Sequence, residues 1–564
     1  MRNNSLFLIL QKMRKPFLVI IVTYVVSIIG FLLIEGRDSS GNVYHMSIFD
    51  AFYFVSYTAT TIGFGELPYT FTYPQRIWVT ISTYLSVLGW LYSIGSLISL
   101  VQDQQFLKEI EKAKFLRQIK NLNEKFIVVL GYNQITRKII IKAMEQGLRT
   151  VVIEKDKSKI HNLILENFTP TVPVLYSESY SVRVLEMAGL KKRNCKAIVS
   201  LFEDDALNLK ITLTAKALNK NIKVAVKSTT TNHTENLKDL DAEIVVNPFS
   251  IISSEINLAL WSPNLFKLEK WLYGIDNLNS SLPIFPKGLY IVCGYGRMGK
   301  KIFEKLNEND IGVKLIEIDK NKSVESSKDE ILNIVYANAD DKELLLNIGI
   351  KDAVAIAAVT DDDTTNLSIL ATAKKLNPNI VTIVRENDMV DDFLFRSANI
   401  DHIFTPSKIL VNKVTNALVM PLCDKFIKQI IKKDNEWASK LVSRLIKEID
   451  EKPLVMEFEI NEIITPQIYN HLNSNQTLFL SLLRTSLYNK DLRNNVVPLL
   501  LQRENDIILL PEWEYEIKIG DKILLACDSH AKNDIEYICQ NINEFYYALT
   551  GKEKKTILKG FLWL

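Results

Sequence analysis

The stretch Thr60-Thr61-Ile62-Gly63-Phe64-Gly65-Glu66 decides the architecture of the N-terminal part of the chain. Its two glycines, at positions i and i+2, permit backbone conformations that other residues resist. A hydroxyl residue, Thr61, stands two places before the first glycine. The pattern suits a strand-like loop whose carbonyl groups all point to one side. In a four-fold arrangement, rings of such carbonyls replace the water shell of a dehydrated cation.

Two apolar runs flank this loop. Residues 16–34 carry no charge, and as a helix they span about 28 Å, close to the hydrocarbon thickness of a bilayer. A cleaved signal peptide is the alternative, but the run meets Glu35-Gly36-Arg37 and no small-residue cleavage site follows. Residues 77–101 are also uncharged and long enough to span with tilt. The sequence therefore predicts a multi-pass protein of the cell membrane, in contact with lipid.

Basic residues predict the orientation of these spans. They precede the first run and follow the second, at Lys12, Arg14, Lys15, Lys108, Lys112, Lys114, Arg117 and Lys120. Because cytoplasmic flanks carry the excess of Lys and Arg, we expect both termini in the cytoplasm. Between the spans, residues 47–59 predict a half-length helix, capped by Ser47 with Asp50 in its first turn.

Thr61 to Gly65 resembles the Thr-Val-Gly-Tyr-Gly selectivity filter of potassium channels. The order of span, half-length helix, loop and span is similar to the pore unit of that family. The resemblance implies a homotetramer, because one copy per chain cannot enclose a pore, with K⁺ held at Thr61, Ile62, Gly63 and Phe64. Phe64 and Glu66 depart from the usual Tyr and Asp, so a less selective cation pore is the alternative to a potassium-selective one.

The second span carries a stripe of small residues, which falls on one helical face: Ser82, Ser86, Gly89, Ser93 and Ser96. Either this stripe lines the pore, with Gly89 as a gating hinge, or it permits close helix packing. Residues 102–125 are polar, rich in Lys and Glu, and without Pro or Gly. They predict a helix that continues the second span.

An internal repeat with a period near 160 residues follows. Each copy opens with an apolar strand and a glycine turn, at Gly131-Tyr132-Asn133-Gln134-Ile135-Thr136 and at Gly294-Tyr295-Gly296-Arg297-Met298-Gly299. A second strand is then expected to end in an acid, Glu154 or Asp319. Asn208 and Asn366 follow in register, and the copies close at Asn247-Pro248 and Thr405-Pro406. Apolar strands that alternate with helical segments predict a Rossmann-like parallel sheet.

These units resemble RCK domains, the TrkA-N type regulators of potassium conductance. Two copies in each of four chains imply an octameric gating ring. The expected domains are a two-span pore at 1–102, a linker helix at 103–124, a first RCK domain with crossover helices at 125–285, a second RCK N-lobe with crossover helices at 286–435, a small α+β C-terminal lobe at 436–530 and a helical tail at 531–564.

The second glycine turn meets every condition of a dinucleotide fingerprint. Its expected ligand is NAD(H) or an adenine nucleotide such as AMP, ADP or ATP, contacted by residues 294–299, Asp319 and Asn338. A carboxylate at position 319 repels a 2′-phosphate and so disfavours NADP. The first turn has Asn133 and Thr136 in place of two glycines, so we expect a structural role there. A second nucleotide site would use Gly131, Glu154 and Glu178.

The remaining function classes are narrowed by composition. A net charge of +3 does not indicate nucleic-acid binding. The acidic trios 203–205 and 361–363 make Ca²⁺ a candidate ligand, but they lack the spacing of a calcium loop. An NAD-dependent oxidoreductase is the remote alternative, and no recognisable catalytic context surrounds the histidines: His45, His161, His233, His402, His471 and His530. We therefore expect a ligand-gated channel and not an enzyme.

Overall fold

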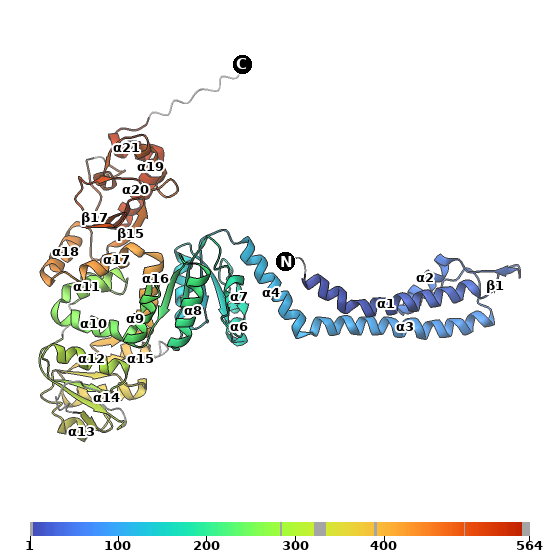
Figure 1. Cartoon of the computed structure of the whole chain (residues 1–564), viewed down its shortest axis with the longest axis horizontal. Coiled ribbons are helices and arrows are strands. Elements are labelled where there is room, and N and C mark those ends of the chain that lie inside the picture. Colours follow the sequence, from blue (N-terminus) through green and yellow to red (C-terminus); the bar gives the residue numbers. More distant parts are fainter. Residues whose placement is uncertain (1–3, 282–284, 321–333, 388–391, 490, 555–564) are drawn as a thin grey trace, which may run out of the picture. The chain divides into compact units, whose positions relative to one another are not determined.

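A computed structural model describes residues 4–281, 285–320, 334–387, 392–489 and 491–554. The chain divides into two compact units, residues 1–122 and 123–564 (Figure 1). Each unit is described by itself below.

The first unit is built on two long helices that lie side by side, α1 (Asn4–Leu33) and α3 (Tyr73–Gln102). Within them, Met13–Leu33 and Tyr73–Gln102 are long and apolar enough to cross a membrane, with mean hydropathies of 2.6 and 1.6. Most of their large apolar side chains are exposed, as at Ile21, Leu88 and Leu91. An apolar surface of this extent requires a lipid or protein environment. The fold therefore begins with a membrane pair, as the hydropathy predicts.

The half-length helix α2 (Ile48–Ala59) lies against both long helices, after the short strands β1 (Gly36–Arg37) and β2 (Val43–Tyr44). It begins as predicted, because the Ser47 hydroxyl accepts the Asp50 N–H at 3.2 Å. An aromatic core of Phe31, Phe54 and Phe71 fastens α2 to α1.

The linker differs from the expected continuous helix. Helix α3 ends at Gln102, and Asp103 starts a new helix, α4 (Gln104–Asn121). The Asp103 carboxylate accepts the Gln105 N–H at 2.9 Å, which is an N-cap and not a helix interior. The prediction of one uninterrupted rod was wrong because an acid with extended backbone interrupts it.

The second unit contains two six-stranded parallel sheets of the same topology. Their orders are β5-β4-β3-β6-β7-β8 and β11-β10-β9-β12-β13-β14, the doubly wound Rossmann arrangement. The strands of the first are β3 (Phe126–Leu130), β4 (Arg149–Glu154), β5 (Val174–Tyr176), β6 (Cys195–Ser200), β7 (Lys223–Lys227) and β8 (Ile244–Val246). Those of the second are β9 (Tyr290–Cys293), β10 (Val313–Glu317), β11 (Ile334–Tyr336), β12 (Ala355–Ala358), β13 (Val381–Arg385) and β14 (His402–Phe404).

Helices cover both faces of each sheet. Those of the first repeat are α5 (Gln134–Glu145), α6 (Lys157–Leu165), α7 (Val182–Met187), α8 (Asp205–Leu218) and α9 (Thr231–Asp239). Those of the second are α12 (Arg297–Glu308), α13 (Lys342–Asn347), α14 (Asp363–Leu376) and α15 (Asp392–Ser397).

The two repeats exchange helices. Helix α10 (Pro248–Trp261) follows the first sheet, yet its Phe249, Ile252 and Ile256 pack in the core of the second repeat. Helix α16 (Pro406–Val419) follows the second sheet, yet its Leu410 and Val414 pack with the core of the first (Figure 1). Each repeat therefore completes its core with a helix from the other.

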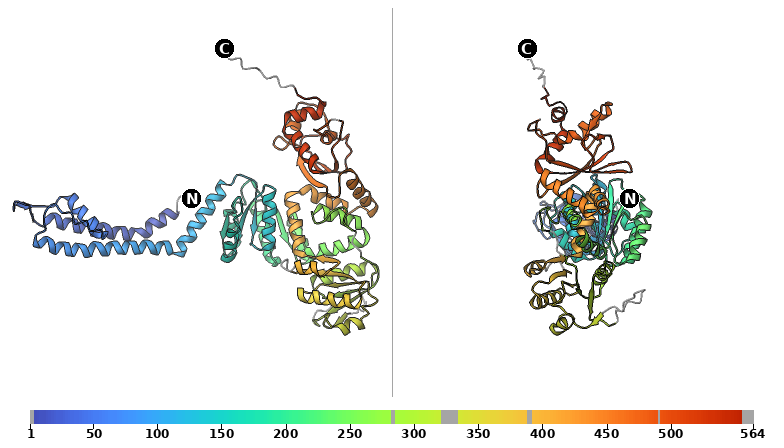
Figure 2. Two further views of the ribbon diagram at one scale, coloured as in Figure 1. Left: turned by 180° about the vertical axis from the view of Figure 1, so that it is seen from behind. Right: turned by 90° about the vertical axis from the view of Figure 1, so that its left-hand side faces the viewer.

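The C-terminal lobe is an antiparallel sheet of order β15-β20-β17-β18, with helices on it (Figure 2). Its strands are β15 (Leu454–Glu459), β17 (Val496–Arg503), β18 (Asp506–Leu509) and β20 (Lys522–Cys527), with a small pair β16 (Leu478–Phe479) and β19 (Glu516–Ile517) and a 3-10 turn at Leu480–Arg484. Helices α11 (Pro263–Leu272), α17 (Pro421–Ile430) and α18 (Asn435–Glu448) join it to the repeats through a shared core.

The expected boundary at residue 531 falls inside a helix. Helices α19 (Pro466–Asn473), α20 (Ser529–Gln540) and α21 (Ile542–Thr550) contribute Ile468, Ile535, Ile538 and Phe545 to the core of this lobe. They are part of the lobe because their apolar faces are covered only there. Residues 555–564 of the expected tail lie outside the described residues.

Candidate functional sites

The filter-like loop has an alternating backbone. Thr61, Gly63 and Gly65 have φ of 59°, 65° and 74°, whereas Ile62 and Phe64 are not among the residues of positive φ. Alternating handedness can turn successive peptide groups to one side. A Cβ at Gly63 or Gly65 would meet no atom of this chain. Glycine is therefore needed at these positions for the positive φ and not for lack of space.

Helix α2 holds both ends of this loop. The Tyr57 carbonyl accepts the N–H groups of Ile62 and Gly63 at 3.0 and 3.2 Å. The Tyr57 hydroxyl donates to the Glu66 carbonyl at 3.1 Å, and the Tyr53 hydroxyl to the Glu66 carboxylate at 2.9 Å. Two tyrosines of α2 that the sequence analysis did not single out thus hold the loop against that helix. The ring of Phe64, which lacks a hydroxyl, stands edge to face with Tyr57 at 6.2 Å.

The small-residue stripe of α3 faces α1. Ser82, Ser86, Gly89 and Ser93 are buried in the unit, and the Ser93 hydroxyl donates to the Pro16 carbonyl at 3.1 Å. A Cβ added at Gly89 would lie 3.0 Å from the Thr23 side chain. Of the two readings, close helix packing therefore describes the stripe, and a gating hinge at Gly89 stays a prediction.

The glycine turn of the second repeat joins β9 to α12. Gly294 has a φ of 101°, and a Cβ at Gly299 would lie 1.8 Å from the Gly294 carbonyl oxygen, so neither position accepts a side chain. Gly296 is the N-cap of α12, with φ of −74° and open space around its missing Cβ. It makes no side-chain cap, so the first N–H groups of α12 are left for a ligand or water.

The acid at the end of the second strand is Glu317 and not Asp319. Strand β10 ends at Glu317, whose buried carboxylate accepts the Tyr295 N–H at 2.6 Å and the Asp319 N–H at 3.0 Å. Asp319 lies two residues beyond the strand. The predicted strand end at Asp319 was wrong, because the strand reaches its acid two residues earlier, at Glu317. Aligning Ile153-Glu154-Lys155-Asp156 with Ile316-Glu317-Ile318-Asp319 finds the correct pair.

Two other predicted contacts are placed as follows. Asn338 follows β11, and its side-chain oxygen accepts the Asp340 N–H at 3.2 Å, so it shapes a turn at the carboxyl edge of the sheet. Arg297, the first residue of α12, has its guanidinium 4.6 Å from the centre of the Phe249 ring and 3.4 Å from the Glu203 carboxylate. The guanidinium of Arg385, which the sequence analysis missed, lies 5.4 Å from the centre of the same ring.

The first repeat closes its turn with side chains. The Asn133 side chain accepts the Thr136 N–H at 2.9 Å, and the Thr136 hydroxyl accepts the Asn133 N–H at 2.8 Å. This reciprocal cap occupies two of the N–H groups at the start of α5 that a phosphate could contact. Glu154, buried, accepts the backbone N–H groups of Tyr132, Lys155 and Asp156, while Glu178 accepts the Tyr176 hydroxyl at 3.4 Å. Gly131 keeps the positive φ of the turn, at 78°.

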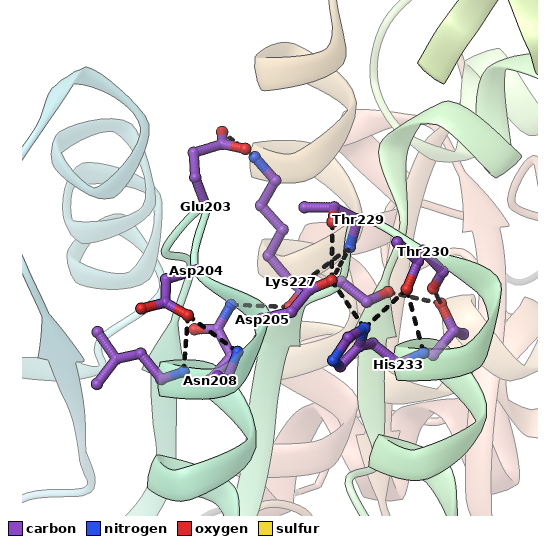
Figure 3. Close-up of polar contacts among 12 residues, drawn as sticks. Glu203, Asp204, Asp205, Asn208, Lys227, Thr229, Thr230 and His233 are labelled. Carbon is purple, nitrogen blue, oxygen red and sulfur yellow. Dashed lines mark hydrogen bonds and ion pairs between the residues drawn. The ribbon is translucent and has the colours of Figure 1, made fainter. Parts of the chain in front are cut away.

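The acidic trios are engaged within the protein. Asp204 caps α8, and Asp205 accepts the backbone N–H and the hydroxyl of Thr229 at 3.0 and 2.7 Å (Figure 3). Asp363 binds Asn387 in the same way in the second repeat. The side-chain amides of Asn208 and Asn366 donate hydrogen bonds to the carbonyl groups of Lys227 and Arg385, at the ends of neighbouring strands. No group of three or more metal-ligating side chains occurs among the described residues, and the calcium prediction gains no support.

Comparisons with known proteins agree with this architecture. The TrkA-N domain family matches residues 127–248 and 290–406. The chain is 26% identical over 267 residues to an uncharacterized protein of Methanothermus fervidus, covering 47% of this chain and 41% of that one. It is 25% identical over 256 residues to Potassium channel protein 1 of Methanocaldococcus jannaschii, covering 45% and 72%. The chain thus spans less than half the length of the first of these relatives.

A solved structure, the GsuK channel, is similar in fold to this chain. The match covers 98% of this chain and 100% of that one, with a TM-score of 0.51 and 15% identity.

Proposed function

Since this chain belongs to the proteins that join a two-helix potassium-channel fold to tandem TrkA-N (RCK) domains, we propose that it conducts K⁺ and that a nucleotide gates it. One observation carries the proposal: a filter loop with positive φ at Thr61, Gly63 and Gly65 is held by α2 between two membrane-type helices, in a chain with two regulatory domains.

The proposed pore is a homotetramer. Each chain supplies one filter loop, and Ile62 and Phe64 are 59% and 63% exposed in the single chain, so the loop has no walls of its own. Four copies around an axis supply carbonyl rings in place of the water shell of K⁺. The same symmetry gives eight RCK units, and the proposed gating element is a ring of these eight.

The proposed ligand is NAD(H) or an adenine nucleotide, bound at the second repeat. Its uncapped α12 N-terminus and open Gly296 suit a pyrophosphate, and Glu317 at the strand end suits a ribose. The first repeat is proposed to be structural, because the Asn133–Thr136 cap already uses two of the matching N–H groups.

Ligand binding is proposed to act by shifting the population of ring conformations. A ligand moves such an equilibrium only by its differential affinity for the two states. The exchanged helices α10 and α16 support this role, because a change in one repeat alters packing in the other.

The test is planar-bilayer recording from the full-length protein. Solutions of KCl and NaCl on opposite sides give the reversal potential, and NAD⁺, NADH, AMP, ADP and ATP are then added in turn to the cytoplasmic side. We expect a reversal potential near the equilibrium potential of K⁺, and a change of open probability with at least one nucleotide. Equal permeability to Na⁺ would contradict the pore assignment, and indifference to all five ligands would contradict the gating assignment.

A further inference from the structure

An ion pair joins the two repeats at the carboxyl ends of their sheets. Glu203 follows β6 of the first repeat, and Arg297 opens α12 of the second, 94 residues later. Arg297 Nη1 lies 3.4 Å from Glu203 Oε2. The other carboxylate oxygen of Glu203 pairs with Lys227 Nζ, whose side chain is 6% exposed. Figure 3 shows this carboxylate standing clear of the Asp204–Asn208 cluster, beside the Lys227 amine.

The exchanged helix α10 explains why these groups meet. Its second residue, Phe249, packs in the core of the second repeat, and the guanidinium groups of Arg297 and Arg385 lie 4.6 and 5.4 Å from its ring centre. The buried Nε of Arg385 has no hydrogen-bond partner among the described residues. Burial first, and the charge of Arg297 second, lower the pKa of Arg385. Positive charge is therefore concentrated here, and Glu203 offsets part of it.

We propose that Glu203 of the first repeat is a selectivity-determining residue of the nucleotide site in the second. It competes with the ligand's phosphates for Arg297, and it disfavours ligands in proportion to their phosphate charge. This inference rests on the proposed nucleotide site at α12.

The chemistry follows from the place of Arg297 in the glycine turn. As the first residue of α12, it adjoins the N–H groups that a phosphate would contact. A guanidinium binds phosphate as well as carboxylate, so a bound nucleotide and Glu203 would compete for the guanidinium of Arg297. Each further phosphate charge strengthens the attraction to Arg297 and Arg385 but also the repulsion from Glu203.

The charge of the ligand also affects the contact between the two repeats. A phosphate that takes Arg297 from Glu203 removes an ion pair that crosses from one repeat to the other, while the Lys227 pair within the first repeat is kept. Charge on the ligand is thereby linked to the contact between the two sheets.

The test is isothermal titration of the full-length protein with AMP, ADP, ATP and NAD⁺ in Mg²⁺-free buffer. Glu203→Gln is expected to raise affinity by up to about fivefold, the range of a solvent-accessible ion pair, with a gain that grows from AMP to ATP. Arg297→Ala should weaken binding, and adding Glu203→Gln to it should raise affinity by less than Glu203→Gln does in the wild type, because the contact between the two residues is already lost and only the direct repulsion of phosphate is relieved. Glu235→Gln, an exposed change of the same charge in the first repeat, should leave all four affinities unaltered.

Glu203→Gln removes the carboxylate that pairs with Lys227, so the thermal unfolding of this variant is measured together with its nucleotide affinity. If the Glu203→Gln protein fails to fold, Glu203→Asp is used in its place. The shorter side chain keeps the negative charge but moves it one methylene away from Arg297. We expect a smaller gain in affinity, which again grows from AMP to ATP. Wild-type binding with no gain in either variant would overturn the inference alone, as would an equal gain that persists without Arg297. Absence of binding in the wild type would overturn the nucleotide site and the inference together.

Discussion

The carboxylate of Glu317 accepts the backbone N–H of Tyr295 at 2.6 Å and so closes the glycine turn onto the neighbouring strand. Glu154 accepts the N–H of Tyr132 in the first repeat, with the same separation of 22 residues. The two repeats therefore share this contact, although only the second leaves its helix N-terminus uncapped. The acid has a structural role in both repeats, and the ligand-binding role of Glu317 is a proposal for the second repeat alone.

Glu317→Gln should weaken nucleotide binding. A charge-assisted hydrogen bond contributes roughly 1.5–3 kcal/mol, so its loss lowers affinity by about 10- to 150-fold. Asp319→Asn is the matched control, since Asp319 lies beyond the strand end, and its affinity should stay close to that of the wild type. Titration calorimetry with NAD⁺ and ADP measures both. A large loss in Asp319→Asn alone would return the ribose role to Asp319.

Glu154→Ala should destabilise the protein but leave nucleotide affinity unchanged. Three backbone N–H groups donate to this buried carboxylate, and a buried donor left unpaired costs about 1–3 kcal/mol. Thermal unfolding is expected to shift downward, while titration of the folded variant gives the wild-type dissociation constant. Loss of binding in a folded Glu154→Ala protein would show that the first repeat holds the ligand.

Gly63→Ala should abolish conduction or its selectivity for K⁺. Gly63 has a φ of 65°, which a residue with a Cβ adopts only with strain, so the carbonyl geometry of the loop changes. Gly41→Ala, at a φ of 85° with open space around it outside the filter, is the control for strain alone. Reversal potentials in mixed K⁺ and Na⁺ measure the outcome, and a fully selective Gly63→Ala channel would refute the filter assignment.

Glu457 should make stability depend on pH. Its carboxylate accepts the N–H groups of Leu422 and Cys423 at 2.9 and 3.2 Å, at the start of α17. Burial raises the pKa of Glu457 to about 7, against the opposing effect of these bonds and of Lys223 and Lys425. A raised carboxyl pKa means that the folded protein binds the proton more tightly. Its contribution is therefore fully present below pH of about 4.5 and is lost as pH rises through about 7.

Glu457→Gln removes this titration. We expect its unfolding free energy to vary less between pH 4.5 and 7, and at pH 8 to exceed that of the wild type by up to about 3 kcal/mol. Chemical denaturation at several pH values measures it. An unchanged pH profile would mean that the carboxyl group titrates normally.

The sequence by itself determined the elements and their order. Uncharged runs, a serine cap and two glycines were enough for the pore unit, because each acts within a few residues along the chain. Likewise, apolar strands alternating with helices specify a parallel sheet wherever they occur, and their repetition specified it twice. The positions of Gly294 and Gly299 follow from the same local requirement, a turn without side chains.

Only the tertiary structure decided which residues meet. Glu317 replaces Asp319 as the strand-end acid because strand length is set by pairing with β9 and β11 and not by local hydropathy. Gly89 faces Thr23, and α20 completes the C-terminal lobe, because apolar and small surfaces are buried against partners distant in sequence. The exchange of α10 and α16, which brings Arg297 to Glu203, has the same cause. Each of these helices has an apolar face that packs on the neighbouring repeat. A sequence pattern predicts that a helix face is apolar, but it does not predict which part of the chain covers that face.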